Sequence, residues 1–247
     1  MTTRWHGRGQ AAGAVAVLAA LAWTAPCRAA EADVRAAVTV VQDGKPLARV
    51  VLPAGAPTAL QDAAALLVDG VRKRTGVTLQ TVTDPAAAVT GLADIHCGLT
   101  ATAARLDLGL TGMDADGFVI AFPDPHSIVL AGATDTGTEY AVDEFLERYA
   151  GVRWLLPGPA GEHVPTAPHL IVPAGTVRSQ PAFQHRLFSG LGKAESAEHR
   201  GEQSLWARRN RMHDRVQFHH NPGGCFCRRP SRQSTRTSTR SSTASVS

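Results

Sequence analysis

The spacing of hydrophobic positions changes several times along the chain and predicts alternating strands and helices. Two β-branched runs, AAVTVVQ and ARVVL, flank the turn DGKP within residues 36–52, which predicts a hairpin. Over residues 60–71 apolar side chains recur on one helical face, and Gly76 predicts the end of that helix. The first third of the chain therefore shows both strand and helix periodicity.

The same alternation continues toward residue 175. The runs VTLQTV, ADIHCG, GFVIAF and SIVLAG predict short strands, with a helix over Thr100–Leu108 between the second and the third. A longer helix follows, which Asp135 or Thr136 is expected to cap and Gly151 to end. After it, VRWLLP and HLIVP predict two more strands. This order predicts an α/β fold, specifically a two-layer α/β sandwich over residues 34–175.

A different pattern begins at Pro181. PAFQHRLFSG predicts a strand and a loop, Glu198–Met212 a helix, and VQFHHN a second strand. A (β/α) barrel begins in this order, so residues 181–221 are predicted to be the start of a truncated TIM barrel. Residues 222–247 are predicted to be a disordered tail, because from Cys225 onward there is no Asp, Glu, Ile or Leu to build a core.

The N-terminus has the pattern of a secretory signal. Arg4 and Arg8 precede an apolar run over residues 11–25, and the C-R-A that follows fits cleavage after Ala29. We therefore expect residues 1–29 to be a signal peptide, the mature protein to be secreted or periplasmic, and no integral membrane segment to remain after cleavage.

The net charge of +4 overstates how basic the protein is. Of its 25 Lys and Arg residues, three lie in the first 29 positions and five in the last 23, which leaves 17 against 21 Asp and Glu in the body. A body with an acidic balance argues against nucleic acid as a partner. The sequence does not indicate an oligomeric state.

Cysteine usage excludes a disulfide framework, because Cys97 is the only thiol of the body. Its neighbour His96 raises the alternative of a metal or nucleophile site, but no second Cys and no regularly spaced His accompany the pair. Burial in a strand is the preferred interpretation. No metal site, no cofactor and no catalytic residue are predicted.

Two features of the predicted helix after residue 135 have ordinary structural explanations. Its carboxylates lie largely opposite the apolar face and are expected to form a solvated surface; they are Glu139, Asp143, Glu144 and Glu147. The preceding segment GATDTGTEYA fits turn and cap chemistry better than an anion site.

Three residues are candidates for contact with a carbohydrate. Arg186 is predicted at the end of the first barrel strand, where it either contacts sugar hydroxyls or a uronate, or forms a structural salt bridge. His220 and Asn221 are predicted at the matching end of the second strand, where they either contact sugar or cap the strand. These three residues form the predicted substrate-binding site.

Three segments carry a resemblance to a known family: DADGFVIAF, the long run from Ile128 to Pro165, and PAFQHR. Across residues 36–221 the chain resembles the N-terminal part of bacterial proteins with domain of unknown function 4838. These are related to the α-glucuronidases of glycoside hydrolase family 67, and their N-terminal sandwich is similar to that of family 20 β-hexosaminidases. The resemblance implies a carbohydrate-active protein whose catalytic carboxylates lie in a following barrel, with Arg186 as a sugar contact.

The resemblance ends after Asn221. Reading codons chosen for residues 225–247 two bases forward yields a string similar to the segment that follows in this family, so we interpret the tail as frameshifted. The chain is then the non-catalytic N-terminal part of a secreted glycoside hydrolase-like protein of carbohydrate degradation, inactive as truncated. The alternative is a stand-alone carbohydrate-binding or scaffold module, because the predicted sandwich is long enough to bury a core alone.

Overall fold

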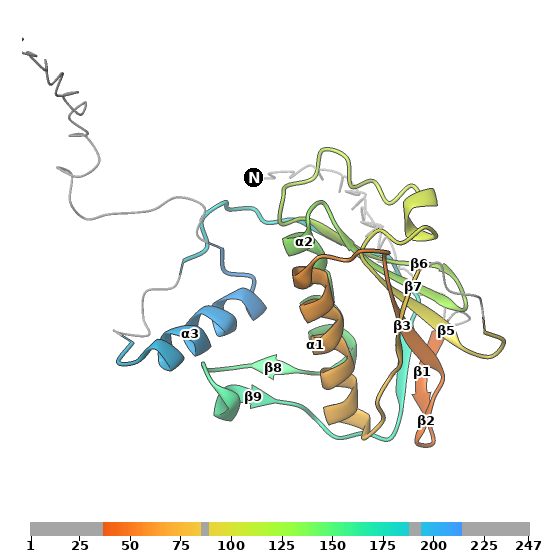
Figure 1. The fold of residues 1–247 in the computed structure, drawn as a ribbon, viewed down its shortest axis with the longest axis horizontal. Helices are drawn as coiled ribbons and strands as arrows, with labels where there is room; N and C mark the ends of the chain where they lie inside the picture. Colours follow the sequence, from red (N-terminus) through yellow and green to blue (C-terminus); the bar gives the residue numbers. More distant parts are fainter. Residues whose placement is uncertain (1–36, 85–88, 188–193, 214–247) are drawn as a thin grey trace, which may run out of the picture. The chain divides into compact units, whose positions relative to one another are not determined.

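A computed structural model describes residues 37–84, 89–187 and 194–213 of the chain (Figure 1). Its centre is a six-stranded sheet in the order β11-β6-β7-β5-β3-β4. The strands are β3 (Ala48–Leu52), β4 (Thr81–Thr83), β5 (Ala93–Cys97), β6 (Phe118–Asp124), β7 (Ser127–Gly132) and β11 (Val177–Ser179). Strands β4, β3, β5 and β7 are parallel, whereas β6 and β11 are antiparallel to their neighbours. The predicted α/β class is confirmed.

A second, three-stranded sheet has the order β10-β1-β2 and consists of β1 (Ala37–Gln42), β2 (Lys45–Pro46) and β10 (Leu170–Pro173). The predicted hairpin was wrong in its second strand. The DG turn leads only into the two-residue β2, and β3 departs to pair in parallel with β4 and β5. All five residues of β3 are buried, and a strand buried on both faces belongs inside a parallel sheet.

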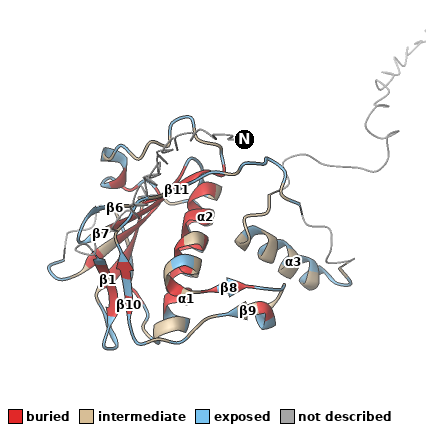
Figure 2. Ribbon diagram, turned by 180° about the vertical axis from the view of Figure 1, so that it is seen from behind, coloured by how far each residue is buried: buried red, intermediate tan, exposed pale blue. Residues whose placement is uncertain are grey.

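Two helices lie side by side on one face of the six-stranded sheet (Figures 1 and 2). Helix α1 (Thr58–Thr75) ends as predicted at Gly76, which adopts φ 77° and donates its N–H to the Arg72 carbonyl at 2.8 Å. Helix α2 (Asp135–Phe145) continues as the π-helical turn η2 (Leu146–Ala150) and ends at Gly151. Its cap is Thr134 rather than Asp135 or Thr136, since the Thr134 hydroxyl accepts the Gly137 N–H at 3.2 Å.

The opposite face of the sheet carries a smaller apolar cluster. Val129 and Ala131 belong to it, whereas their neighbours in β7 belong to the main core, as the alternation of a strand requires. The predicted helix over Thr100–Leu108 was wrong: only a 3₁₀ turn, η1 (Ala103–Arg105), forms there. Leu106, Leu108 and Leu110 alternate with polar or glycine positions, and this period of two covers the sheet without a helix.

The last described elements follow the helix layer. A small hairpin pairs β8 (Arg153–Trp154) with β9 (Glu162–His163), joined through the 3₁₀ turn η3 (Pro159–Gly161). The edge strand β11 lies just beyond residue 175. In the segment predicted as a strand and a loop, the described residues 181–187 contain only an isolated bridge at His185, whereas the predicted helix is present as α3 (Ala197–Arg209).

Several predictions fall outside the described residues: the signal peptide, the strand VQFHHN with His220 and Asn221, and the tail over residues 222–247. No helix in the part of the chain that the structure describes is both long and apolar enough to cross a membrane.

Candidate functional site

The acidic face of α2 is covered by the end of α3, which corrects the expectation of a solvated surface. Glu139 is only 8% exposed and accepts a hydrogen bond of 2.7 Å from Arg208. Arg211 lies between Glu144 and Glu147, at 2.9 and 2.5 Å from their carboxylate oxygens. Because these arginines are about 70 positions away in sequence, helical spacing within α2 gives no sign of them.

Asp143, at the centre of this face, is completely buried. Neither of its carboxylate oxygens has a hydrogen-bond partner among the described residues. Burial raises the pKa of Asp143 well above its ordinary value, and Glu139 and Glu147 add to the rise, while Arg211 and Arg209 oppose it. The α2–α3 contact therefore contains one carboxyl group that favours its neutral form.

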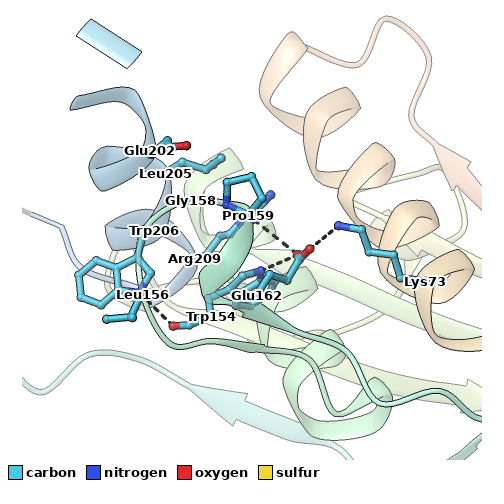
Figure 3. A pocket seen from close by; sticks show the side chains of 10 residues that line it. All are labelled: Lys73, Trp154, Leu156, Gly158, Pro159, Glu162, Glu202, Leu205, Trp206 and Arg209. Atoms are coloured by element: carbon cyan, nitrogen blue, oxygen red, sulfur yellow. Dashed lines mark hydrogen bonds and ion pairs between the residues drawn. The ribbon is translucent and has the colours of Figure 1, made fainter. Parts of the chain in front are cut away.

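A pocket of about 290 Å³ opens where α3 faces the β8–β9 hairpin and the C-terminal half of α1 (Figure 3). We call it the indole pocket, because two of its ten lining residues are tryptophans. They are Lys73, Trp154, Leu156, Gly158, Pro159, Glu162, Glu202, Leu205, Trp206 and Arg209. None of these residues was predicted as a site residue from the sequence.

The hairpin side of the indole pocket is organised by Glu162. The Trp154 indole N–H donates to Glu162 Oε1 at 3.1 Å, and Lys73 forms an ion pair with the same carboxylate. Lys73 Nζ also lies 2.8 Å from Asp69 Oδ2. Burial lowers the pKa of the Lys73 amine, but its hydrogen bonds to Asp69 and Glu162 outweigh burial and raise it. Lys73 is therefore a charged residue with both of its carboxylate partners in place.

The α3 side of the indole pocket is joined to the same hairpin. The Trp206 indole N–H donates to the Trp154 carbonyl at 3.0 Å. Arg209 lies over the Trp154 ring, 5.4 Å from its centroid, and 3.7 Å from Glu162 Oε1. Glu202 has no hydrogen-bond or ion-pair partner among the described residues and faces Gly158, where an added Cβ would lie 3.2 Å from its carboxylate. One carboxylate of this pocket is thus still available to a ligand.

Arg186, the predicted sugar contact, lies in a second cluster around Asp116. Its guanidinium pairs with Asp116 and donates Nε to the Arg211 carbonyl and NH1 to the Phe183 carbonyl, both at 2.7 Å. The Asp116 side chain is 1% exposed, and His213 Nδ1 lies 3.0 Å from both of its oxygens. All three guanidinium nitrogens are engaged, a geometry that fits the salt-bridge alternative for Arg186.

A smaller cavity of about 140 Å³ lies beside this cluster and is lined in part by Tyr140, Gln180 and Arg186. Burial raises the pKa of the Tyr140 phenol, and Asp116 adds to the rise while Arg186 opposes it. Tyr140 is therefore a neutral wall of this cavity at physiological pH.

His96 and Cys97 have the structural role preferred from the sequence. Both are buried in β5, and His96 Nδ1 lies 2.9 Å from the Thr100 hydroxyl. Burial raises the pKa of the Cys97 thiol to about 12, so its reactive thiolate form is suppressed. Among the described residues no group of three or more His, Cys, Asp or Glu side chains is arranged to hold a metal ion.

Comparison with known proteins gives only distant similarities. No protein-family model matches the sequence, and no curated protein does. One similar solved structure is a family GH115 4-O-methyl-α-glucuronidase with specificity for decorated arabinogalactans, at 14% identity and a TM-score of 0.46 over 69% of this chain and 25% of that one. Another is the GH20 β-N-acetylhexosaminidase from Streptomyces coelicolor A3(2), at 17% identity and 0.38 over 61% and 25%. The chain thus matches about a quarter of the length of these two enzymes.

Proposed function

We propose that this chain is the non-catalytic N-terminal part of a secreted glycoside hydrolase-like protein of carbohydrate degradation, and that its sandwich holds the segment that follows it. The observation that carries this proposal is the set of ion pairs and polar contacts between residues 116–147 and residues 186–213. Asp116 binds Arg186 and His213, while the acidic face of α2 binds Arg208 and Arg211. A supporting domain needs this kind of specific attachment to the chain that leaves it.

The state of the carboxylates supports a non-catalytic role. Glycoside hydrolysis uses two carboxyl groups that flank the scissile bond, one of which gives up or takes a proton. Five of the carboxylates nearest to the two cavities and the α3 contact are instead paired with Arg, Lys or His; they are Asp116, Glu139, Glu144, Glu147 and Glu162. Two others have no partner among the described residues, Glu202 in the indole pocket and Asp143 in the α2–α3 contact. Asp143 is completely buried and does not line the indole pocket, so these two carboxyl groups do not flank a common site.

The direct test is an activity assay on the purified chain with aryl-glycosides and aryl-uronides. We expect turnover no faster than in the protein-free blank. Turnover that Arg186→Ala abolishes, and that the exposed-site control Arg105→Ala leaves intact, would overturn the proposal.

Secretion is part of the same proposal and has its own test. The chain is expressed with its leader in a bacterial host, and the N-terminus of the protein in the exported fraction is sequenced. We expect it to begin at Ala30, after cleavage behind Ala29. Retention in the cytoplasm with the leader attached contradicts this part.

The second candidate function is a stand-alone carbohydrate-binding module. It is favoured by the indole pocket, which combines aromatic surface with charged hydrogen-bonding groups. The two functions depend on residues 186–213 in different ways. A binding module needs the indole pocket that α3 helps to form, whereas a supporting domain needs only the ion pairs that attach these residues.

A further inference from the structure

We infer that the indole pocket binds a single pyranose ring of a neutral glycan, with Glu202 accepting hydrogen bonds from its hydroxyl groups. The carbohydrate class rests on the proposed function; the preference for a neutral ring comes from the pocket itself. The pocket is distinct from the Arg186 cluster, with which it shares no lining residue.

The size of the pocket favours one ring over an extended chain. Its volume of about 290 Å³ is at the lower end of the range for small-molecule sites, roughly 300–1,000 Å³. Its mouth is bordered by apolar side chains, with Leu156 64% exposed and Leu205 43% exposed. Exposed leucines beside a half-buried Trp206 offer apolar surface to the C–H face of a sugar ring.

The charges of the pocket are already balanced, and this decides between a neutral and an acidic ligand. Two cations, Lys73 and Arg209, line it together with two carboxylates, Glu162 and Glu202. Lys73 is held by Asp69 and Glu162, and Arg209 by the Trp154 ring and Glu162. A uronate carboxylate would therefore have to displace an existing ion pair and would meet repulsion from Glu202.

Glu202 gives the pocket the recognition group that a neutral sugar needs. An ionised carboxylate accepts several hydrogen bonds and offers no donor, so it suits the adjacent hydroxyl groups of a pyranose. It projects from α3 toward Gly158, and its carboxylate lies so close to this glycine that an added Cβ would be 3.2 Å from it (Figure 3). Glu202 and the apolar rim together define a site with one polar and one apolar side.

The experiment is a binding panel on the full chain, read by saturation-transfer NMR and calorimetry. The probes are the methyl glycosides of glucose, galactose, xylose and N-acetylglucosamine, with methyl glucuronide and methyl galacturonide as the acidic members. We expect at least one neutral glycoside to bind more tightly than either uronide. We also expect Glu202→Gln to weaken that binding about tenfold, the loss expected for a charged hydrogen bond.

Two further variants keep the test interpretable. Glu198→Gln removes an exposed carboxylate from the first turn of the same helix and should leave binding unchanged. Leu205→Ala removes apolar rim surface from an exposed position and should weaken binding a few-fold without unfolding the chain.

Tighter binding of a uronide, or binding that is insensitive to Glu202→Gln or to Leu205→Ala, overturns the inference. So does the absence of binding by every neutral probe. That last result leaves the supporting role in place, because that role is tested by the absence of turnover and not by affinity for sugar.

Discussion

Helices α1 and α3 are held in the fold by different means. Helix α1 buries six of its residues against the sheet, including Leu60, Leu67 and Val71. Helix α3 has no buried residue. Apart from the half-buried Trp206, it is held mainly by ion pairs of Arg208, Arg209 and the following Arg211. Salt does not screen apolar burial, whereas it does screen exposed and partly exposed ion pairs. The first helix thus belongs to the cooperative core, and the second is a separable attachment.

The largest effect should follow from a cavity under α1. Leu67 is fully buried, so Leu67→Ala should lower the free energy of unfolding by about 2–5 kcal/mol. Urea denaturation followed by circular dichroism measures the change. The control Leu187→Ala, at a 63% exposed position, should change it by less than about 0.5 kcal/mol. Equal effects of the two substitutions would contradict the assignment of α1 to the core.

Asp143 is the carboxyl group of the α2–α3 contact that has no hydrogen-bond partner among the described residues. Its folded-state pKa is raised, so folding favours the protonated form, and stability declines as pH rises from the unfolded pKa of about 4 toward the folded value. Asp143→Asn removes this decline. We expect the variant to match the wild type near pH 4 and to exceed it by about 1–3 kcal/mol at neutral pH. Thermal unfolding across this pH range measures the difference, and parallel curves for the two proteins would refute it.

A smaller and local effect should follow from loosening α3. Arg211→Ala removes the ion pairs to Glu144 and Glu147, together worth about 1 kcal/mol. Hydrogen exchange in α3 should accelerate several-fold while exchange in α1 stays unchanged. Adding 1 M NaCl to the wild type should have the same selective effect. Arg105→Ala, an exposed arginine far from α3 in sequence, is the control.

The smallest expected effect is on the melting temperature, when one glycine in each helix is replaced by alanine. A Cβ at Gly70 in α1 would lie 2.6 Å from Leu146 Cδ2, whereas a Cβ at Gly201 in α3 would meet nothing within 4 Å. Gly70→Ala should therefore lower the melting temperature by a few degrees, because Leu146 must move. Gly201→Ala should leave it unchanged or raise it slightly through helix propensity. The opposite order of melting temperatures would show that α3 is the tightly packed helix.

The sequence predicted the elements whose pattern of apolar residues is set locally, either by one buried helical face or by a continuous buried strand. The apolar stripe of α1, its end at Gly76 and the bounds of β7 follow from residues a few positions apart. The helix predicted over Thr100–Leu108 does not form. Leu106 and Leu108 are two positions apart, and both pack against the smaller apolar cluster on that face of the sheet. Strand β11 was not predicted, since a three-residue edge strand with one half-buried Val177 has no period to detect.

The candidate site could not be predicted in the same way. Trp206 and Trp154 meet 52 positions apart, and Glu202 faces a glycine that carries no side chain to signal it. Arg186 was recognised as important, but its partner Asp116 is 70 positions earlier in the chain. The solvated face predicted for α2 was wrong for the same reason, because the arginines that cover it lie in α3 and just after it, more than 60 positions away.

The pairing of the outer sheet has a consequence for how the protein is made. Strand β1 is flanked by β2 and β10, and Val41 pairs with Leu170. Strand β1 is synthesised early, yet the backbone hydrogen bonds along its β10 edge cannot form until β10 has also been synthesised. During that interval the buried side of β1, which includes Val38 and Val40, is exposed to other nascent chains. The outer sheet can therefore close only after β10 is available, and chains truncated before residue 170 should give a higher yield of aggregates.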